Sequence, residues 1–342
     1  MSATRSLTCC SAGNVSFGSS FTSRLRTRSS RGRALRVARL ECVNAVKFAS
    51  ASKAGKRGED ASFTIQEKDK TFLAVYDGRN GADAAQYLKE NFYNNFSKEM
   101  ESAPPANAFV SAYVGTDKTM CTSTPPGLFG MFQARGIGGA RCASTAVTAL
   151  VMGDNVVVAN AGDCRALAIK GDEVSQLTVD HTGESEEERA RMEEAIIATL
   201  KEKEDVAARI AQRDPSKVFL YGDAVSRGTG FTWQLVQAGT SFPVGSAVTR
   251  SLGDAFLSSS DQLPRGYGMI AEPAVTTIPV SDASWLVLAS APVWKSLGNE
   301  EVAKACMSGG DADAAAKAVL AAASAKAGED EDLTVVVAQL DA

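Results

Sequence analysis

The chain has 342 residues, which is enough for two average domains or for one large domain behind a targeting segment. Its 44% hydrophobic and 22% charged residues are typical of a folded chain, and no apolar run is long enough to cross a bilayer, so we expect no membrane span. The single histidine, His181, excludes histidine-rich zinc sites, and the net charge of −4 gives no basic excess for nucleic acid.

The first 50 residues differ from the rest in composition. They hold nine basic residues and one acidic residue and are rich in Ser, Thr and Ala, which predicts an organelle transit peptide over 1–50. A Ser-rich start without an apolar segment favours the chloroplast stroma, with the mitochondrion as one alternative and a retained basic arm as another. The remainder holds 27 basic and 39 acidic residues, so we expect no nucleic-acid partner.

From residue 55 to residue 342 the pattern alternates between strands and helices. A nearly continuous apolar run at 71–76 predicts a central strand that stops at Asp77, and helical spacing of apolar residues follows at 82–100. Two hairpins are predicted next, each turning at a Gly-Asp pair. Their strands are 145–152 with 155–160, and 165–170 with 173–178.

Further elements complete a pattern of helices outside and antiparallel ribbons inside. Residues 104–139, rich in Gly, Pro and Met, are expected to form a loop-rich insertion, and the charged stretch 184–213 an exposed helical segment. Buried strands are expected at 285–290 and 333–340, with an Ala-rich helix at 311–327 between them. The natural packing of these elements is an α/β (α+β) sandwich.

Nine short blocks then follow one another in a fixed order between residues 58 and 340. Each block alone is weak evidence. Together and in this order they resemble the PPM-type metal-dependent Ser/Thr protein phosphatases (type 2C). The blocks are Gly58-Glu59-Asp60-Ala61, Ala74-Val75-Tyr76-Asp77-Gly78, Ser144-Thr145-Ala146-Val147, Ala159-Asn160-Ala161-Gly162-Asp163-Cys164-Arg165, Asp180-His181-Thr182, Thr249-Arg250-Ser251-Leu252-Gly253-Asp254, Ala271-Glu272-Pro273, Leu288-Ala289-Ser290 and Leu333-Thr334-Val335-Val336-Val337.

The resemblance implies two central antiparallel sheets flanked by helices on both sides, with Mg²⁺ or Mn²⁺ in a cleft at one end. Such ions prefer oxygen ligands, and a carboxylate that bridges two of them places an activated water beside phosphorus. The family motif D-G-H-G-G supplies that carboxylate, which matches Asp77, and a glycine carbonyl, which matches Gly78. Asp60 matches the acid of the upstream E-D pair.

Four positions depart from the family pattern. Arg79 replaces the family histidine, a proposed proton donor, and a guanidinium is too basic for that role. Ala291 replaces a metal-binding Asp, and Lys295 replaces a second acid. At the family's final D-N pair the chain has Glu331 followed by Asp332, so a longer carboxylate occupies the metal-ligand position. We therefore expect the binding of Mg²⁺ or Mn²⁺ to be weak or absent.

Fixed positive charges accompany these losses. Asp60, Asp77 and Glu331 without two cations would repel one another, and Arg79 and Lys295 offer partial compensation if their side chains face the cleft rather than solvent. Arg79 is also a candidate phosphate ligand, because arginine binds phosphate through two parallel hydrogen bonds. Arg57, just before the E-D pair, is a second candidate, near a position where the family often has a phosphate-contacting arginine.

Two functions follow from this pattern. The first is a pseudophosphatase that binds a phosphoprotein or another protein partner, as a regulatory or structural subunit in an organelle. The second is an active Mg/Mn-dependent Ser/Thr phosphatase with a metal cage rearranged around Glu331, Asp332 or Asp330. A neighbouring acid such as Asp254 would fill the gap at Ala291 only if the backbone brought it to the ion; its other expected role is to stabilise a turn. His181 and Cys164 are expected to be structural.

Overall fold

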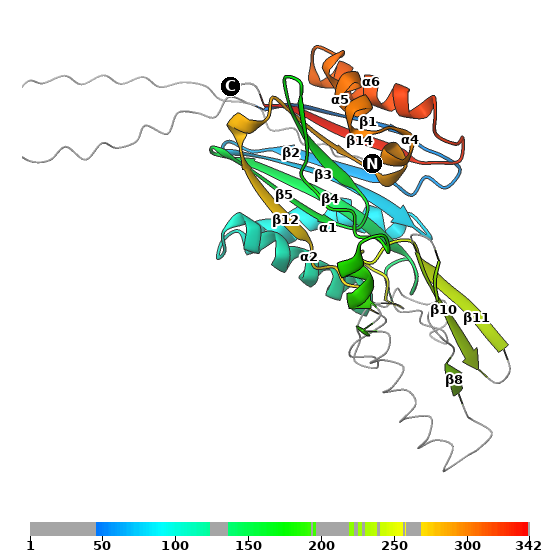
Figure 1. Cartoon of the computed structure of the whole chain (residues 1–342). Helices are drawn as coiled ribbons and strands as arrows, with labels where there is room; N and C mark the ends of the chain where they lie inside the picture. Colours follow the sequence, from blue (N-terminus) through cyan, green and yellow to red (C-terminus); the bar gives the residue numbers. More distant parts are fainter. Residues whose placement is uncertain are drawn as a thin grey trace, which may run out of the picture. The chain divides into compact units, whose positions relative to one another are not determined.

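The protein is represented by a computed structural model (Figure 1). The residues that it describes are 46–123, 136–192, 194–195, 219–221, 225–227, 230–237, 240–255, 257 and 268–340. Residues 42–342 cluster as one unit, whereas residues 1–45 of the predicted transit peptide lie outside the described residues.

Two five-stranded sheets form the centre of this unit, and all of their neighbouring strands are antiparallel. This arrangement confirms the predicted sandwich and both predicted hairpins. The first sheet has the order β1 (Lys47–Lys53), β14 (Leu333–Gln339), β13 (Trp285–Ala289), β6 (Arg165–Lys170) and β7 (Glu173–Gln176). The second has the order β12 (Ala274–Pro279), β5 (Asn155–Ala161), β4 (Ala143–Met152), β3 (Lys70–Arg79) and β2 (Ala61–Gln66).

A third, smaller sheet comes from the segment between β7 and β12. Its strands are β11 (Thr240–Ser246), β10 (Gly230–Gln237) and β8 (Phe219–Tyr221), with β9 (Val225–Arg227) paired to β10. The end of β11 matters for the site, because Ser246 and the two residues after it reach the cleft described below.

Alternation along β3 explains why the sheets stack. Successive side chains of a strand point to opposite faces, so a strand that is apolar at every position must be covered on both. Phe72 and Tyr76 belong to the core beneath the helices, whereas Leu73 and Val75 belong to the core between the two sheets. The continuous apolar run at 71–76 therefore marks a central strand, as predicted.

Helices cover the outer faces of both sheets (Figure 1). α1 (Asp83–Glu99) and α2 (Pro105–Thr122) pack on the sheet that contains β3. α4 (Ala291–Ser296), α5 (Asn299–Met307) and α6 (Ala312–Ser324) pack on the sheet that contains β14, and the short 3₁₀ helix η3 (Val280–Asp282) precedes β13. No helix in the described part of the chain is both long and apolar enough to span a membrane.

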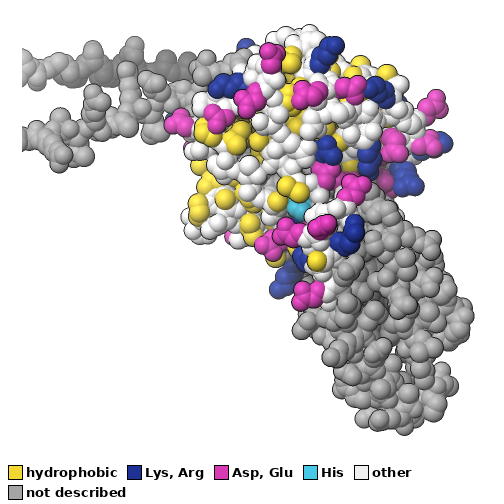
Figure 2. Space-filling view, viewed as in Figure 1, with side chains coloured by type: hydrophobic (Ala, Val, Ile, Leu, Met, Phe, Trp, Pro, Cys, Tyr) yellow, Lys and Arg dark blue, Asp and Glu magenta, His cyan; other side chains and the backbone are white. Residues whose placement is uncertain are grey.

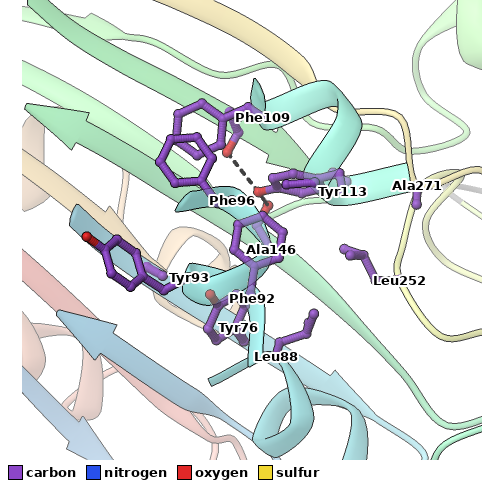
Figure 3. Packing of buried hydrophobic residues seen from close by; sticks show 14 of the residues in the cluster. Tyr76, Leu88, Phe92, Tyr93, Phe96, Phe109, Tyr113, Ala146, Leu252 and Ala271 are labelled. Atoms are coloured by element: carbon purple, nitrogen blue, oxygen red, sulfur yellow. Dashed lines mark hydrogen bonds between the residues drawn. The ribbon is translucent and has the colours of Figure 1, made fainter. Parts of the chain in front are cut away.

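The predicted loop-rich insertion at 104–139 is wrong over its first half, which forms α2. The Pro104-Pro105 pair suggests a loop, but proline is well accommodated in the first turn of a helix, where an N–H would lack a partner. Figure 3 shows the aromatic packing that holds α2 against α1: the rings of Phe96 and Phe109 are stacked 4.2 Å apart. Residues 124–135 lie outside the described residues.

Two other boundaries differ from the expectations. The sheet begins with β1 at Lys47, before the predicted start at residue 55. The sequence did not predict this edge strand because its small and polar residues give no strong strand pattern. In the predicted exposed segment 184–213, residues 186–192 are helical, but Glu188 and Met192 are buried against neighbouring chain. Residues 196–213 of that segment lie outside the described residues.

Candidate functional site

A cleft of about 430 Å³ lies at the end of the sandwich where β3 and β13 end and β2, β6 and β14 begin. On the face shown in Figure 2, acidic and basic side chains lie interspersed, and hydrophobic side chains are most frequent on the left of the view. The residues that match the family site all line this cleft, whereas Asp254 does not. Its lining comprises Lys56, Arg57, Glu59, Asp60, Asp77, Gly78, Arg79, Asp163, Ala247, Val248, Ala291, Pro292, Lys295, Asp330, Glu331 and Asp332.

Asp60 and Asp77 form the acidic floor of the cleft. Burial raises the pKa of Asp60 to about 6, against the effect of hydrogen bonds with Ser290 and Thr334. Burial also raises the pKa of Asp77, and the negative charges of Asp60 and Asp163 raise it further. Oδ2 of Asp60 is buried and has no hydrogen-bond partner. Nearby positive charges and hydrogen-bond donors therefore do not fully compensate for the burial and mutual repulsion of these two carboxyl groups.

Ala291 stands where the family motif has a metal-binding aspartate. It is the first residue of α4, is 4% exposed, and its backbone N–H donates a 2.9 Å hydrogen bond to Oδ2 of Asp77. A backbone donor thus occupies an oxygen of Asp77. Pro292, the next residue, lies in the first turn of α4, so its missing N–H leaves no helical bond unmade.

Close packing against Glu59 explains why position 78 is a glycine. A Cβ there would lie 2.2 Å from the carbonyl oxygen of Glu59, so any side chain would push the two loops apart. Glu59 reinforces the contact, since its Oε1 accepts a 2.8 Å hydrogen bond from the N–H of Gly81. Glu59 thus lines the cleft and ties the segment before β2 to the turn after β3.

Glu331 lines the cleft as predicted, but its neighbour Asp332 has a structural role that the sequence did not indicate. The carboxylate of Asp332 accepts hydrogen bonds from the backbone N–H groups of Gly55, Gly58 (3.2 Å) and Glu59 (2.8 Å). Three N–H donors on one carboxylate fix the loop that carries Arg57 and Glu59 against the start of β14.

Lys295 faces the cleft rather than open solvent alone. Its ammonium lies 3.4 Å from Oδ2 of Asp163, in the turn between β5 and β6, although the side chain is 69% exposed. The charge of Lys295 also opposes the rise in the pKa of Asp77. Asp163 was visible in the sequence within its Gly-Asp-Cys-Arg block, but only the fold places it beside Asp77 and Lys295.

The two arginines of the site differ in their surroundings. Arg57 is 74% exposed at the rim, with Nη1 3.9 Å from Oε2 of Glu59. Arg79 is half-buried, and its Nη1 donates a 3.0 Å hydrogen bond to Oγ of Ser246. Ser246 lies 167 residues further along the chain, and no sequence signal links the two.

Asp254 is buried and does not line the cleft. Burial raises its pKa to about 6, and the positive charge of Arg79 acts against that rise. Its Oδ1 accepts a hydrogen bond from the N–H of Leu257. This geometry indicates that Asp254 stabilises the turn that leads to Leu257.

The cleft lacks the carboxylate that the family motif has at position 291, where this chain has Ala291. Small hard cations need several oxygen ligands around one point. Within the described ranges, no group of three or more Asp, Glu, His or Cys side chains is arranged to hold an ion. The unpartnered Oδ2 of Asp60 is the kind of atom that a cation would bind. On Asp77, by contrast, Oδ2 already accepts a hydrogen bond from the N–H of Ala291.

Comparisons with known proteins agree with this architecture. The family model described as Protein phosphatase 2C matches residues 45–212 and 224–332. "Probable protein phosphatase 2C 28" of Arabidopsis thaliana is 28% identical over 280 residues, covering 81% of this chain and 66% of the relative. "Probable protein phosphatase 2C 44" of Oryza sativa subsp. japonica is 29% identical over 292 residues, covering 83% and 74%. The chain thus spans about two thirds to three quarters of these relatives.

Solved structures show the same fold at low sequence identity. A serine-threonine phosphatase 2C from Toxoplasma gondii superposes with a TM-score of 0.60 at 16% identity, over 87% of this chain and 96% of that chain. A sex-determining protein of C. elegans gives a TM-score of 0.61 at 18% identity, over 87% and 65%. With the sandwich, the ordered blocks and the family match over most of its length, the chain belongs to the protein phosphatase 2C family.

Proposed function

We propose that this protein is a catalytically impaired member of its family, a pseudophosphatase that binds a phosphoprotein as a regulatory or structural subunit. The observation that carries the proposal is at Ala291: a methyl group replaces a carboxylate, and the N–H of that residue donates to Asp77. Asp77 is the acid that the family uses to bridge its ions. One oxygen of Asp77 already accepts a backbone hydrogen bond and the carboxylate at position 291 is missing, so fewer oxygen ligands remain for an ion that would activate water.

The charges of the cleft support the same conclusion. Lys295 lies beside Asp163 and acts on Asp77, so a fixed ammonium supplies positive charge in a cleft where relatives rely on divalent ions. Arg79 stands in place of the family histidine. Neither residue can donate a proton to a leaving alcohol usefully. We therefore propose that Mg²⁺ or Mn²⁺ binds weakly or not at all.

An active phosphatase is the second candidate, and one observation favours it. Asp163 lies close enough to Asp77 to raise its pKa, so it is an acid that could replace the missing ligand at position 291. The curated relatives are also named as phosphatases. On this alternative, Asp60, Asp77, Asp163 and Glu331 would hold the ion that activates water.

We propose further that residues 1–50 direct the protein to the chloroplast stroma, on the composition of that segment. Fusion of these residues to a fluorescent protein tests this in plant cells. Fluorescence in plastids supports the proposal, whereas fluorescence in mitochondria or the cytosol contradicts it.

Calorimetry with Mn²⁺ and Mg²⁺ on residues 42–342, together with a phosphopeptide hydrolysis assay on the same sample, tests the proposed function. We expect no tight metal binding and no release of phosphate from a protein that is folded by circular dichroism. Metal-dependent release of phosphate would show that other acids have rebuilt the cage, and the active phosphatase would then be the correct function.

A further inference from the structure

The guanidinium of Arg79 is fixed on one side only. Its Nη1 donates to Oγ of Ser246 at 3.0 Å. That hydroxyl is itself held, because it donates to the carbonyl oxygen of Val248 at 2.7 Å and accepts from the N–H of Val248 at 3.3 Å. Val248 lines the cleft. One end of the guanidinium is therefore anchored to the wall of the cleft that follows β11.

The other side of the same group has no partner. Nε and Nη2 of Arg79 are both buried, and neither makes a hydrogen bond. These two nitrogens point their hydrogens in the same direction, which makes the edge that grips two oxygens of a carboxylate or phosphate. Buried donors are nearly always satisfied, so an unused edge of this kind calls for an acceptor.

Two other arginines of this protein show what normally fills such an edge. Nε and Nη2 of Arg165 both donate to the carboxylate of Asp180, at 2.7 to 3.0 Å. Nε and Nη2 of Arg250 both donate to Oε1 of Glu188, at 3.1 and 2.6 Å. Each of these edges has a carboxylate supplied by the chain, whereas that of Arg79 does not.

Asp254 does not fill the gap. Asp254 is close enough for the charge of Arg79 to act on it, yet Oδ1 of Asp254 accepts from the N–H of Leu257, and Nε and Nη2 of Arg79 remain unpartnered. The edge is thus oriented by Ser246, charged, and free of a carboxylate from the chain itself. An oxyanion from outside is the ligand with matching geometry and charge.

We propose that the Nε and Nη2 edge of Arg79 is the binding site for a phosphoryl group carried by a partner protein. The choice of phosphoryl over carboxylate rests on the proposed function, since the edge itself accepts either. Both nitrogens are covered, so the ligand must displace the groups that shield them. The side chain that replaces the family histidine thereby becomes a ligand for phosphate.

Titration calorimetry of the full-length protein tests the proposal, with a phosphoserine peptide, its serine counterpart, its glutamate counterpart and inorganic phosphate as probes. Arg79→Lys keeps the charge and loses the two-donor edge. We expect this variant to bind the phosphopeptide at least about tenfold more weakly than the wild type. Lys317→Gln, which removes an exposed positive charge on α6, is the control and should change the affinity less than about twofold.

Ser246→Ala provides a second variant that leaves the arginine in place. Loss of the anchoring hydroxyl should weaken phosphopeptide binding by a smaller factor, about threefold to tenfold, because the edge is then less well oriented. Arg57→Gln tests the other predicted phosphate ligand. A loss of binding in Arg57→Gln but not in Arg79→Lys would overturn the assignment to Arg79.

The outcomes separate this inference from the proposed function. If the wild type hydrolyses the peptide while Arg79→Lys loses phosphate affinity, the pseudophosphatase proposal fails and the Arg79 site stands. If the wild type is inert and Arg79→Lys binds the phosphopeptide as well as the wild type does, the Arg79 site is wrong and the proposed function stands. Equal binding of the glutamate and phosphoserine peptides would show a carboxylate ligand and overturn the phosphoryl assignment.

Discussion

Ala291 places a methyl group where the family motif has a carboxylate, and its N–H donates to Asp77 at 2.9 Å. Arg79 replaces the family histidine two residues after Asp77, and its guanidinium is held by Ser246. These two positions alter the metal ligands and the proton donor separately. Both changes should be reversed together to test whether they account for the proposed loss of activity.

The double variant Arg79→His/Ala291→Asp should regain some Mn²⁺-dependent hydrolysis of a phosphopeptide. The added aspartate crowds Asp60 and Asp77, so we expect a lower melting temperature in EDTA and a rise on addition of Mn²⁺. At a metal concentration one hundred times the dissociation constant, the stabilisation would be about 2.7 kcal/mol. A double variant as inert as the wild type, with no Mn²⁺-dependent melting shift, would show that other positions cause the loss.

His181 is 2% exposed and gives the molecule a titration of its own. Its Nδ1 accepts a 3.3 Å hydrogen bond from the N–H of Gly162, which requires the neutral ring. Burial, and next the positive charge of Arg250, lower the pKa of His181 to about 4. Because the unfolded chain takes up this proton near pH 6.5, the contribution of His181 to stability is full above that pH and declines toward pH 4.

Urea unfolding of the wild type and of His181→Gln at pH 7.5 and pH 5.0 checks this prediction. The wild type should lose about 2 kcal/mol more than the variant between the two pH values, because one pKa unit corresponds to about 1.4 kcal/mol. The raised pKa values of Asp60 and Asp254 act in the opposite direction in both proteins, so the comparison removes them. Equal losses in the two proteins would mean that His181 titrates normally in the fold.

At the scale of elements, the hairpins and central strands followed from local pattern, whereas α2 did not. Gly153-Asp154 and Gly171-Asp172 mark turns between strands of alternating or continuous apolar residues, and both hairpins are present. The segment 105–122 carries a helical stripe of mixed residue types that begins with two prolines. This stripe is recognisable only once α2 packs against α1, where its buried residues form part of an aromatic core.

Phe109→Ala tests whether α2 belongs to this core. Phe109 is fully buried and stacks on Phe96, so we expect a loss of about 3 to 5 kcal/mol in the free energy of unfolding. Val114 on the same helix is 46% exposed, and Val114→Ala should cost less than about 1 kcal/mol. Similar small effects for both variants would show that Phe109 is not part of the core and would favour the loop-rich insertion that the composition suggests.

At the scale of the molecule, Glu188 joins distant parts of the chain. It is 3% exposed and accepts hydrogen bonds from Arg191, Arg250 and Thr249. Although burial opposes ionisation, these bonds lower the pKa of Glu188. The network fixes the helical residues 186–192 to the segment that continues from the cleft wall at Val248.

Glu188→Gln should therefore destabilise the whole unit by about 3 to 5 kcal/mol, because two arginines then lack a carboxylate in a buried setting. The exposed neighbour Glu187 provides a matched control, and Glu187→Gln should change stability by less than about 0.5 kcal/mol. Denaturant unfolding measures both. If the two variants are equally stable, Glu188 does not organise this part of the fold.

Motifs and local patterns in the chain were enough to predict the family, the sandwich and most of the cleft. Asp60, Asp77, Gly78, Arg79, Ala291 and Glu331 were all identified from motifs, and all line one cleft. This worked because the motifs lie at strand ends, and antiparallel strands of two stacked sheets bring those ends together. Local pattern also gave the buried strands, since a strand covered on both faces is apolar at every position.

The pairing of the charges in the cleft could not be predicted and is known from the folded chain. In the fold, Lys295 lies beside Asp163, the N–H of Ala291 donates to the Asp77 carboxylate, and Arg79 donates to Ser246. These contacts join segments separated by more than one hundred residues, and each depends on which rotamer and which loop conformation the packing selects. Charge type can be read from a sequence, but charge pairing is a distance, and distances between remote segments exist only once the chain has folded.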